Sequence, residues 1–267
     1  MDNRIRIYEQ YYNINIIDDI FNVKIDEEYS KDTVNLYWFP NPHILNIVYK
    51  ICDNLILSDN NKKKIIEIGP GHCPFKYANL FIGHNEKINN YIDIDIDKEK
   101  LPFPDNYIDF IYCRHVIEDI VNPEFALNEI FRTCKNGYIE TPSPLIETSK
   151  NVDGYRNEKL IQMRGYMHHH SLIYSDIENN IIYILPKHFL IEYFDSDNEC
   201  YKNVINKYGV YWNNYFIWDE KRGKPTIINL MKNKELYDGS PDNFMKLLSD
   251  AIIISFKNTN YLVKNYK

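Results

Sequence analysis

The stretch IIEIGPG, residues 65–71, decides the fold that we expect for this chain. Its isoleucines indicate a buried strand, and a turn with two glycines, Gly69 and Gly71, follows directly. Glycines at the carboxyl end of a parallel strand let the backbone approach a ligand closely, and open α/β sheets bind ligands at that edge. The stretch therefore predicts a nucleotide-binding turn, although a lone Gly-x-Gly also occurs in tight turns for steric reasons alone.

The residues around this turn favour a nucleoside without phosphates. A dinucleotide-binding fingerprint has a third glycine where its helix packs beneath a pyrophosphate, and Pro74 occupies that position here. The Lys-Ser/Thr pair of a phosphate-binding loop is also absent. Glu67 precedes the first glycine, and its carboxylate would repel a phosphate but attract an ammonium group.

Strands and helices are expected to alternate on both sides of the turn. In chain order, we expect a helix at 41–57 with Asn41 as its N-cap, a strand at 64–69, a helix at 74–82 that ends at Gly83, strands at 88–96 and 107–113, a helix at 123–134 and a strand at 137–141. This alternation predicts an α/β fold: a Rossmann-like, mostly parallel sheet with helices on both faces.

The pattern changes after Pro144. We expect an antiparallel β-hairpin extension around DIENN (176–180), a further β-rich stretch at 208–221, and a helix at 240–255 that begins with a capping signature. The chain then divides into a helical N-terminal flank at 1–60, a core at 61–200, and a C-terminal extension at 201–267 packed on the core.

The composition excludes several function classes. The chain has 267 residues with 44% hydrophobic side chains, which is enough for a filled core, and its net charge of −7 argues against nucleic-acid binding. The five cysteines are scattered, so we expect reduced thiols rather than a disulfide framework or a zinc ribbon. The N-terminus has no apolar signal core, and no run of about 18 apolar residues predicts a membrane span. These features predict a cytoplasmic protein without a membrane partner.

Two longer stretches resemble a known family. IIEIGPG, together with YIDIDIDKEKLPFPDNYIDFIYCRHVIEDIVNPEFALNEIFRTCKNGYIETP, resembles the class I S-adenosylmethionine-dependent methyltransferases of the small-molecule, "type 11" kind, over about residues 64–145. RGYMHHHSLIYS and LPKHFLIEYF are similar to the C-terminal half of a bacterial subgroup linked to glycan modification. The resemblance implies S-adenosylmethionine as cofactor and a small-molecule acceptor, with a hydroxyl of a sugar or glycan as the leading expectation.

The resemblance also assigns cofactor-binding roles. The matched positions are Glu67, Gly69 and Gly71 for the methionine amine and the turn, Asp95 for the ribose, Asp97 and Leu101 for the adenine, and Arg114 and His115 for the sulfonium side. Two features depart from the family pattern. The helix and strand that normally separate the ribose acid from the LPF motif are missing, and Cys73 stands where a glycine often follows the turn.

Three acids at period two surround the expected ribose site. A carboxylate that ends the second strand, about 20 residues after the glycine turn, can accept both ribose hydroxyls, and Asp95 fits that spacing. Asp93 and Asp97 flank it. Which of the three binds ribose stays open, as does the alternative that all are solvated acids at a strand end.

The run MHHHSL offers His168, His169 and His170 as catalytic candidates. A hydroxyl acceptor benefits from a general base, and histidine suits neutral pH. In an extended segment His168 and His170 would share one face and His169 the other. The alternative is that these histidines only form hydrogen bonds at the surface or in the core. A metal site of two histidines and a carboxylate is a further alternative, but we expect none.

Other functions also remain open. The chain could be a catalytically inactive methyltransferase-fold module that binds a partner, which the departures from the family pattern favour. RNA or protein methylation lacks a basic patch or substrate motif in the sequence. TPSP (141–144) differs from the Asn/Asp-Pro-Pro-Tyr motif of base-amine methylases, which disfavours methylation of DNA amines.

Overall fold

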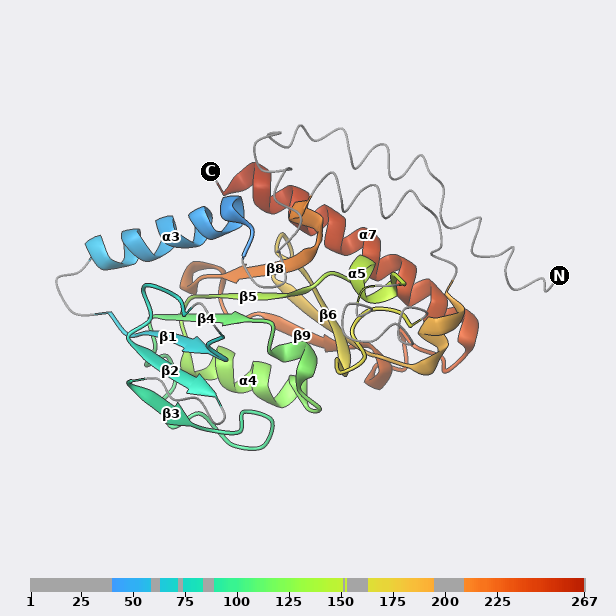
Figure 1. Cartoon of the computed structure of the whole chain (residues 1–267), viewed down its shortest axis with the longest axis horizontal. Coiled ribbons are helices and arrows are strands. Elements are labelled where there is room, and N and C mark those ends of the chain that lie inside the picture. The colour runs from blue at the N-terminus through green and yellow to red at the C-terminus, as the bar shows by residue number, and fades with distance from the viewer. Residues whose placement is uncertain are drawn as a thin grey trace.

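A six-stranded sheet forms the centre of the molecule (Figure 1). The computed structural model describes residues 40–58, 63–71, 74–83, 89–150, 152, 163–194 and 209–266. The strands lie in the order β3-β2-β1-β4-β5-β8, and their bounds are β1 Ile65–Ile68, β2 Leu80–Gly83, β3 Tyr91–Asp93, β4 Phe110–Arg114, β5 Gly137–Pro142 and β8 Asn213–Trp218. All neighbouring pairs are parallel except β5 and β8. This order confirms the predicted Rossmann-like α/β fold, with the reversal of strand order between β1 and β4.

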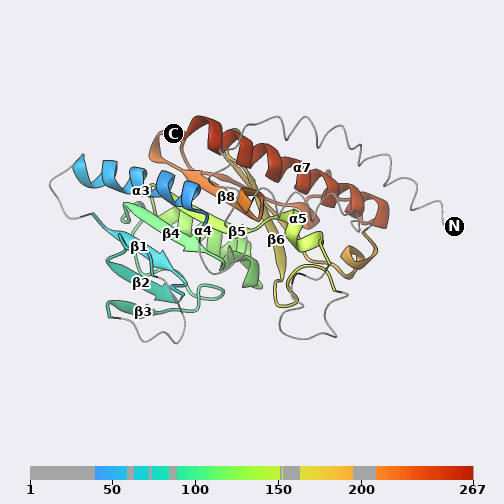
Figure 2. The ribbon, with the colours of Figure 1, turned by 45° about the horizontal axis from the view of Figure 1, so that its top comes forward.

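Helices cover both faces of this sheet, as Figures 1 and 2 show. On one face Tyr49 of α3 (Pro42–Leu57) stacks on Phe75, which stacks on Tyr112 of β4 at 4.2 Å between ring centroids. On the other face Phe131 of α4 (Pro123–Thr133) meets Phe216 of β8 edge-on. Side chains alternate along a strand, so these contacts assign the two helices to opposite faces.

Two helices begin with caps that the sequence indicates. The Asn41 side chain accepts a hydrogen bond from the backbone N–H of His43 at the start of α3. Ser240 accepts one from the N–H of Asn243 at the start of α7 (Pro241–Asn265), which extends well beyond the predicted 255. Such caps satisfy backbone donors that have no partner within the helix. Both helices are therefore confirmed, as is α4.

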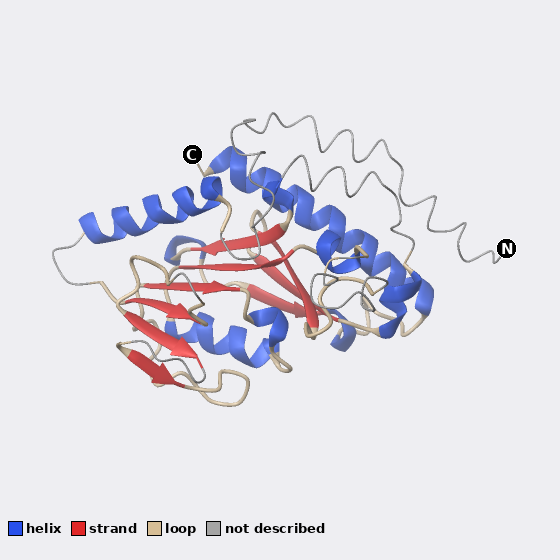
Figure 3. Cartoon of the chain, viewed as in Figure 1, coloured by secondary structure: helices blue, strands red, loops and turns tan. Residues whose placement is uncertain are grey.

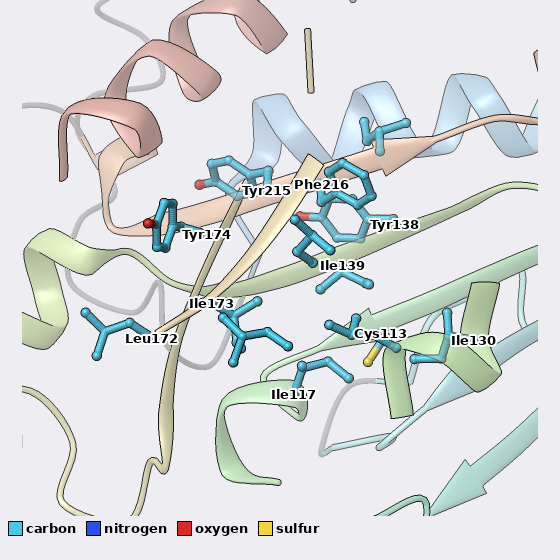
Figure 4. Packing of buried hydrophobic residues seen from close by; sticks show 14 of the residues in the cluster. Cys113, Ile117, Ile130, Tyr138, Ile139, Leu172, Ile173, Tyr174, Tyr215 and Phe216 are labelled. Atoms are coloured by element: carbon cyan, nitrogen blue, oxygen red, sulfur yellow. The ribbon is translucent and has the colours of Figure 1, made fainter. Parts of the chain in front are cut away.

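A second sheet of three strands packs beside the first. The predicted hairpin is confirmed as β6 (Ser171–Asp176) and β7 (Ile181–Pro186), and β9 (Thr226–Asn229) joins β7 in parallel. Thr141 of β5 donates its hydroxyl to the carbonyl of Ile173 at 2.9 Å, and Ser175 donates to the carbonyl of Tyr215 at 2.9 Å. Figure 4 shows Ile173 on the side toward Ile139 and Ile117, and these residues belong to one buried cluster.

Short helices complete the described part of the chain (Figure 3). They are α5 (Pro144–Thr148) and the 3₁₀ helices η2 (Ile117–Asp119), η4 (Phe189–Tyr193), η5 (Gly209–Tyr211), η6 (Glu220–Arg222) and η7 (Leu230–Lys232). Among the described residues, no helix has the length and apolar character needed to cross a bilayer.

The predicted helix at 74–82 is wrong. Residues Leu80–Gly83 form β2, which pairs with β1 on one side and β3 on the other. A short apolar run such as LFI fits a helix or a buried strand equally well, and pairing with two neighbours decides for the strand. The stretch expected to be the second strand is consequently the third, β3, at the edge of the sheet.

The expected core and the expected C-terminal extension contribute strands to the same sheets. Residues of the expected C-terminal extension form β8 inside the main sheet and β9 inside the second one. The extension is therefore continuous with the core through backbone hydrogen bonds, and the boundary at 200 stays a prediction. Most of the predicted N-terminal flank, residues 1–39, lies outside the described residues, whereas α3 is its described helix.

Candidate functional site

The glycine turn lies where the parallel strands of the main sheet end. Gly69 follows β1 with φ +69°, and its N–H donates to the carbonyl of Ile82 at 2.8 Å. A Cβ at Gly69 would lie 2.2 Å from Cγ2 of Val116, in the segment after β4. A Cβ at Gly71 would meet nothing within 4 Å. Gly69 is thus required by the packing of two loops, whereas Gly71 borders open space.

Glu67 is buried beneath this turn, with 4% of its surface exposed. Its Oε2 accepts a hydrogen bond from the N–H of Phe75 at 2.7 Å. Burial raises the pKa of Glu67 to about 7, although the Phe75 N–H and the charge of Arg114 act in the opposite direction. One carboxylate oxygen therefore fixes the backbone after the turn, and binding of a methionine ammonium by Glu67 stays a prediction.

The acid ladder lies at a different place from the one expected. Asp93 ends β3, the edge strand, so Asp95 follows the third strand rather than the second. Asp95 forms an ion pair with Lys98 at 2.6 Å, and Asp97 accepts a hydrogen bond from the N–H of Asn122 at 2.6 Å. The strand count used for Asp95 is therefore corrected, whereas its contact with the ribose, which also rests on its place in the motif, stays a prediction. The residues directly after β2, 84–88, contain Glu86 and lie outside the described residues.

Leu101 is a core residue in this structure, with 3% of its surface exposed. Its backbone N–H donates to Oε2 of Glu129 on α4 at 3.1 Å. Arg132 binds the same carboxylate at 2.7 Å and also the carbonyl of Leu101 at 3.1 Å. The LPF motif is therefore tied to α4, and contact between Leu101 and an adenine stays a prediction.

Arg114 and His115 meet around a buried carboxylate. Glu140 of β5 is fully buried and pairs with Arg114, whose Nε lies 3.0 Å from Oε1. Tyr138 and Asn213 also donate to this carboxylate. Burial alone would raise the pKa of Glu140, but Arg114 and the hydrogen bonds hold it at about 2. Sequence reasoning missed Glu140, because nothing local distinguishes it from other strand residues.

His115 sits between two glutamates. Its Nδ1 lies 3.1 Å from Oε1 of Glu118, and its Nε2 lies 3.8 Å from Oε1 of Glu140. Burial would lower the pKa of His115, but the hydrogen bonds to Glu118 and Glu140 raise it above its usual value. The backbone of His115 has φ +53°, which is uncommon outside glycine and marks a constrained turn after β4. A role beside a sulfonium stays a prediction.

The histidine run does not have the expected alternation. The second-sheet strand β6 begins only at Ser171, and residues 167–168 form a turn. His169 is buried, whereas His168 and His170 are exposed. Nε2 of His168 and Nε2 of His169 lie 3.7 and 3.6 Å from the same oxygen of Asp119. The structure thus pairs His168 with His169, and the predicted pairing of His168 with His170 is corrected.

Two residues that sequence reasoning missed hold His169 in place. Its Nδ1 lies 2.6 Å from Oε1 of Glu147, and Lys187 donates to the other oxygen of Glu147 at 2.9 Å. Burial alone would raise the pKa of Glu147, but Lys187 and His169 lower it below its usual value. A carboxylate accepts hydrogen bonds only, so Nδ1 of His169 carries the hydrogen and Nε2 points toward Asp119.

One short segment connects the glycine turn with the histidines. Val116 lies against the Gly69 position, and Asp119, three residues later, lies beside His168 and His169. The N–H of His170 donates to the carbonyl of Glu118 at 2.7 Å, which holds the histidine run on η2. The structure therefore brings the glycine turn, Arg114 and the histidines to neighbouring loops at one end of the sheet.

Part of the chain matches known proteins. Residues 75–139 match the family model described as a methyltransferase domain, which is well under half of the chain. The chain is similar to a ubiquinone/menaquinone biosynthesis C-methyltransferase of Yersinia enterocolitica, 36% identical over 73 residues. That match covers 26% of this chain and 29% of the relative, so the chain spans less than a third of the length of the curated relative.

Solved structures give only partial likenesses. The YcgJ protein of Bacillus subtilis is 17% identical, with a TM-score of 0.29 over 44% of this chain and 62% of that one. An S-adenosylmethionine-dependent methyltransferase of Mesorhizobium loti is 14% identical, with a TM-score of 0.24 over 36% of this chain and 54% of that one.

S-adenosylmethionine is the cofactor that the matched domain implies. The residues at the turn fit it: Gly71 borders open space, and Glu67 is an acid suited to an ammonium group. When bound, this cofactor supplies an electrophilic methyl group on a sulfonium that leaves as a neutral thioether.

Proposed function

We propose that the chain is an S-adenosylmethionine-dependent methyltransferase that acts on a small polar acceptor. The observation that carries the proposal is the arrangement of the glycine turn, with open space at Gly71, next to a loop that connects it to a buried, oriented histidine. A cofactor-binding turn and a group able to handle a proton are the two parts that methyl transfer to a hydroxyl needs.

The finer part of the proposal is the acceptor, for which we propose a hydroxyl of a sugar or glycan. The support is the histidine run, because a general base helps a hydroxyl much more than a carbon or sulfur nucleophile that is already reactive. Of the three histidines, His169 suits the role of base best, since Glu147 orients it and leaves its Nε2 directed toward the surface at Asp119. The curated relative is named as a C-methyltransferase, so a carbon acceptor is the competing outcome.

Calorimetry with S-adenosylhomocysteine tests the cofactor part on the full chain. We expect binding of this product but not of NAD or ATP. Gly71→Val should fold normally, because a Cβ there meets nothing within 4 Å, yet bind at least about tenfold more weakly because the side chain fills the open space. Gly69→Ala is the contrasting variant and should lose stability, because of its φ of +69° and the contact with Val116. Unchanged affinity in Gly71→Val would place the cofactor elsewhere.

A product-mass screen tests the acceptor. The full chain, S-adenosylmethionine and panels of sugars, glycans and phenolic or quinone-like rings should give a methylated product with a sugar hydroxyl. A methylated ring carbon instead would replace the sugar by the acceptor class of the curated relative.

An inactive binding module remains the second candidate. It is favoured by the internal contacts of Asp95, Asp97 and Leu101, three positions that the family resemblance assigns to the nucleoside. Binding of S-adenosylhomocysteine without methyl transfer to any class of the panel would support this candidate, and absence of binding would contradict the methyltransferase directly.

A further inference from the structure

Three donor atoms meet beside η2. Asp119, His168 and His169 each offer one possible ligand atom, and these three atoms lie within 4.8 Å of one another. Asp119 comes from the loop after β4 and the two histidines from the turn before β6, so only the folded chain brings them together. The sequence did not lead us to expect a metal, because no second histidine cluster has metal-ligand spacing on a helix.

The contacts among these atoms are too long for hydrogen bonds. Asp119 Oδ1 lies 3.7 Å from His168 and 3.6 Å from His169, beyond the 2.7–3.2 Å of ordinary N–H···O bonds. Ligands bound at about 2.0–2.1 Å in a tetrahedral zinc site lie roughly 3.4 Å from one another. The two distances from Asp119 to the histidines are therefore close to those between atoms around a shared ion. The two imidazole rings lie nearly perpendicular, with centroids 4.4 Å apart.

The buried side of the cluster has the support that metal-binding histidines require. A ligating histidine usually donates its second ring N–H to a carboxylate, which fixes the tautomer and the ring orientation. His169 donates from Nδ1 to Glu147 at 2.6 Å, and Lys187 fixes Glu147 through its second oxygen and the carbonyl of Tyr166. Gly165 packs directly against Glu147, since a Cβ at Gly165 would lie 2.3 Å from Glu147 Oε2.

The other side of the cluster is open. The Asp119 and His168 side chains are 43% and 41% exposed, whereas that of His169 is 1% exposed. An ion held by these three residues would keep at least one coordination position toward solvent. Two imidazoles and one carboxylate with an open position are typical ligands of catalytic zinc or non-haem iron rather than of magnesium or calcium.

We infer that Asp119, His168 and His169 bind one divalent transition-metal ion, with Glu147 as the outer partner that orients His169. The role that we assign to this ion rests on the proposed function. A hydroxyl that occupies the open position of such an ion loses its proton at a lower pH than a free hydroxyl does. The ion would then replace His169 as the group that activates the acceptor.

Zinc binding to the full chain tests the inference without any activity measurement. After treatment with a chelator, titration with zinc chloride should show one saturable site per chain. Asp119→Asn and His168→Gln should each weaken it by more than the roughly 10- to 100-fold loss that removal of an outer partner causes, and Glu147→Gln should fall within that range. His170→Gln is the matched control, because its side chain is adjacent in sequence but outside the cluster, and it should retain zinc affinity.

Each outcome separates this inference from the proposed function. Zinc binding that Asp119→Asn and His168→Gln leave unchanged, or no binding at one per chain, overturns the inference. Both variants are at exposed positions, so they should remain folded and give a clear answer. If methyl transfer persists in the presence of chelator but falls in His169→Gln, the proposed function is retained with His169 as the base. The role of a metal ion in that reaction is then overturned. Specific zinc binding without cofactor binding would retain the metal site and contradict the methyltransferase.

Discussion

Two buried glutamates on either side of Ser143, the N-cap of α5, have opposite surroundings. Glu140 lies within the sheet, and its partners Arg114, Tyr138 and Asn213 come from β4, β5 and β8. His115 links Glu140 to a further buried acid, Glu118, and each of these side chains is buried or nearly so. The cluster around Glu140 therefore joins three strands, and the side chains that the structure describes in it are enclosed.

Glu147 is equally buried, but its contacts lead outward. Through His169 they continue to Asp119, whose side chain is 43% exposed. A buried carboxylate thus serves packing when all its partners are internal and can serve chemistry when one partner has a second functional atom at the surface. Both acids have hydrogen-bonded partners, and the two clusters differ in whether those partners lead to an exposed side chain.

The largest expected effect is on stability at the enclosed cluster. Glu140→Gln leaves the guanidinium of Arg114 buried without its counter-charge, so the free energy of unfolding should fall by about 3–5 kcal/mol. Urea unfolding followed by circular dichroism measures it. Glu147→Gln should lose less, because Lys187 retains the carbonyl of Tyr166 as a partner. Equal losses in the two variants would remove the distinction between the clusters.

The second effect is on turnover at the open cluster. His169→Gln should lower the rate of methyl transfer by about 10²-fold or more, whether the residue acts as a base or as a metal ligand. Affinity for S-adenosylhomocysteine should change little. His188→Gln is the control, since His188 caps the backbone of Leu190 and packs on Phe244, outside both clusters. A parallel fall in thermal midpoint and cofactor affinity in His169→Gln would assign the residue to packing alone.

A third buried acid, Glu67, sharpens the comparison because it has no ion-pair partner at hydrogen-bond distance among the described residues. Its pKa is raised from 4.5 to about 7 by burial, so the folded state holds the proton more tightly than the unfolded state. Stability should therefore fall as the pH rises from about 4.5 to 7. Glu67→Gln removes this loss and should be more stable than wild type at pH 8 by about 1–3 kcal/mol, with little difference at pH 5. Urea unfolding at the two pH values measures both, and an identical difference at each would show that Glu67 ionises without penalty.

The smallest effect on stability is expected at the outer end of the open cluster. Asp119→Asn removes a charge from a partly exposed side chain that makes no ordinary hydrogen bond to the histidines, so unfolding should change by no more than about 0.5 kcal/mol. Differential scanning calorimetry against Glu140→Gln gives the contrast. A loss as large as that of Glu140→Gln would make the open cluster structural as well.

Much of the fold could be predicted because its signals are local. The caps Asn41 and Ser240, the 3.6-residue period of α4 and the turn between β6 and β7 each depend on residues close together in the sequence. The glycine turn after β1 was likewise predictable, since it needs only a buried strand and backbone conformations that glycine permits.

The candidate site depended more on the tertiary structure. The three histidines were visible in the sequence, but an assumed extended segment paired His168 with His170, and a turn in the chain instead directs His168 and His169 to Asp119. Glu147 and Lys187 carry no local signal, because their roles arise only from contact with each other and with His169.

The sequence by itself determined the α/β class, the position of the glycine turn and the starts of α3, α4 and α7. Only the tertiary structure decided that Leu80–Gly83 is a strand, that the acid ladder follows the third strand, and that one buried glutamate is enclosed while another leads to the surface. The physical reason is range: period and capping act over a few residues, whereas strand pairing and the partners of a buried charge depend on where distant segments of the chain meet.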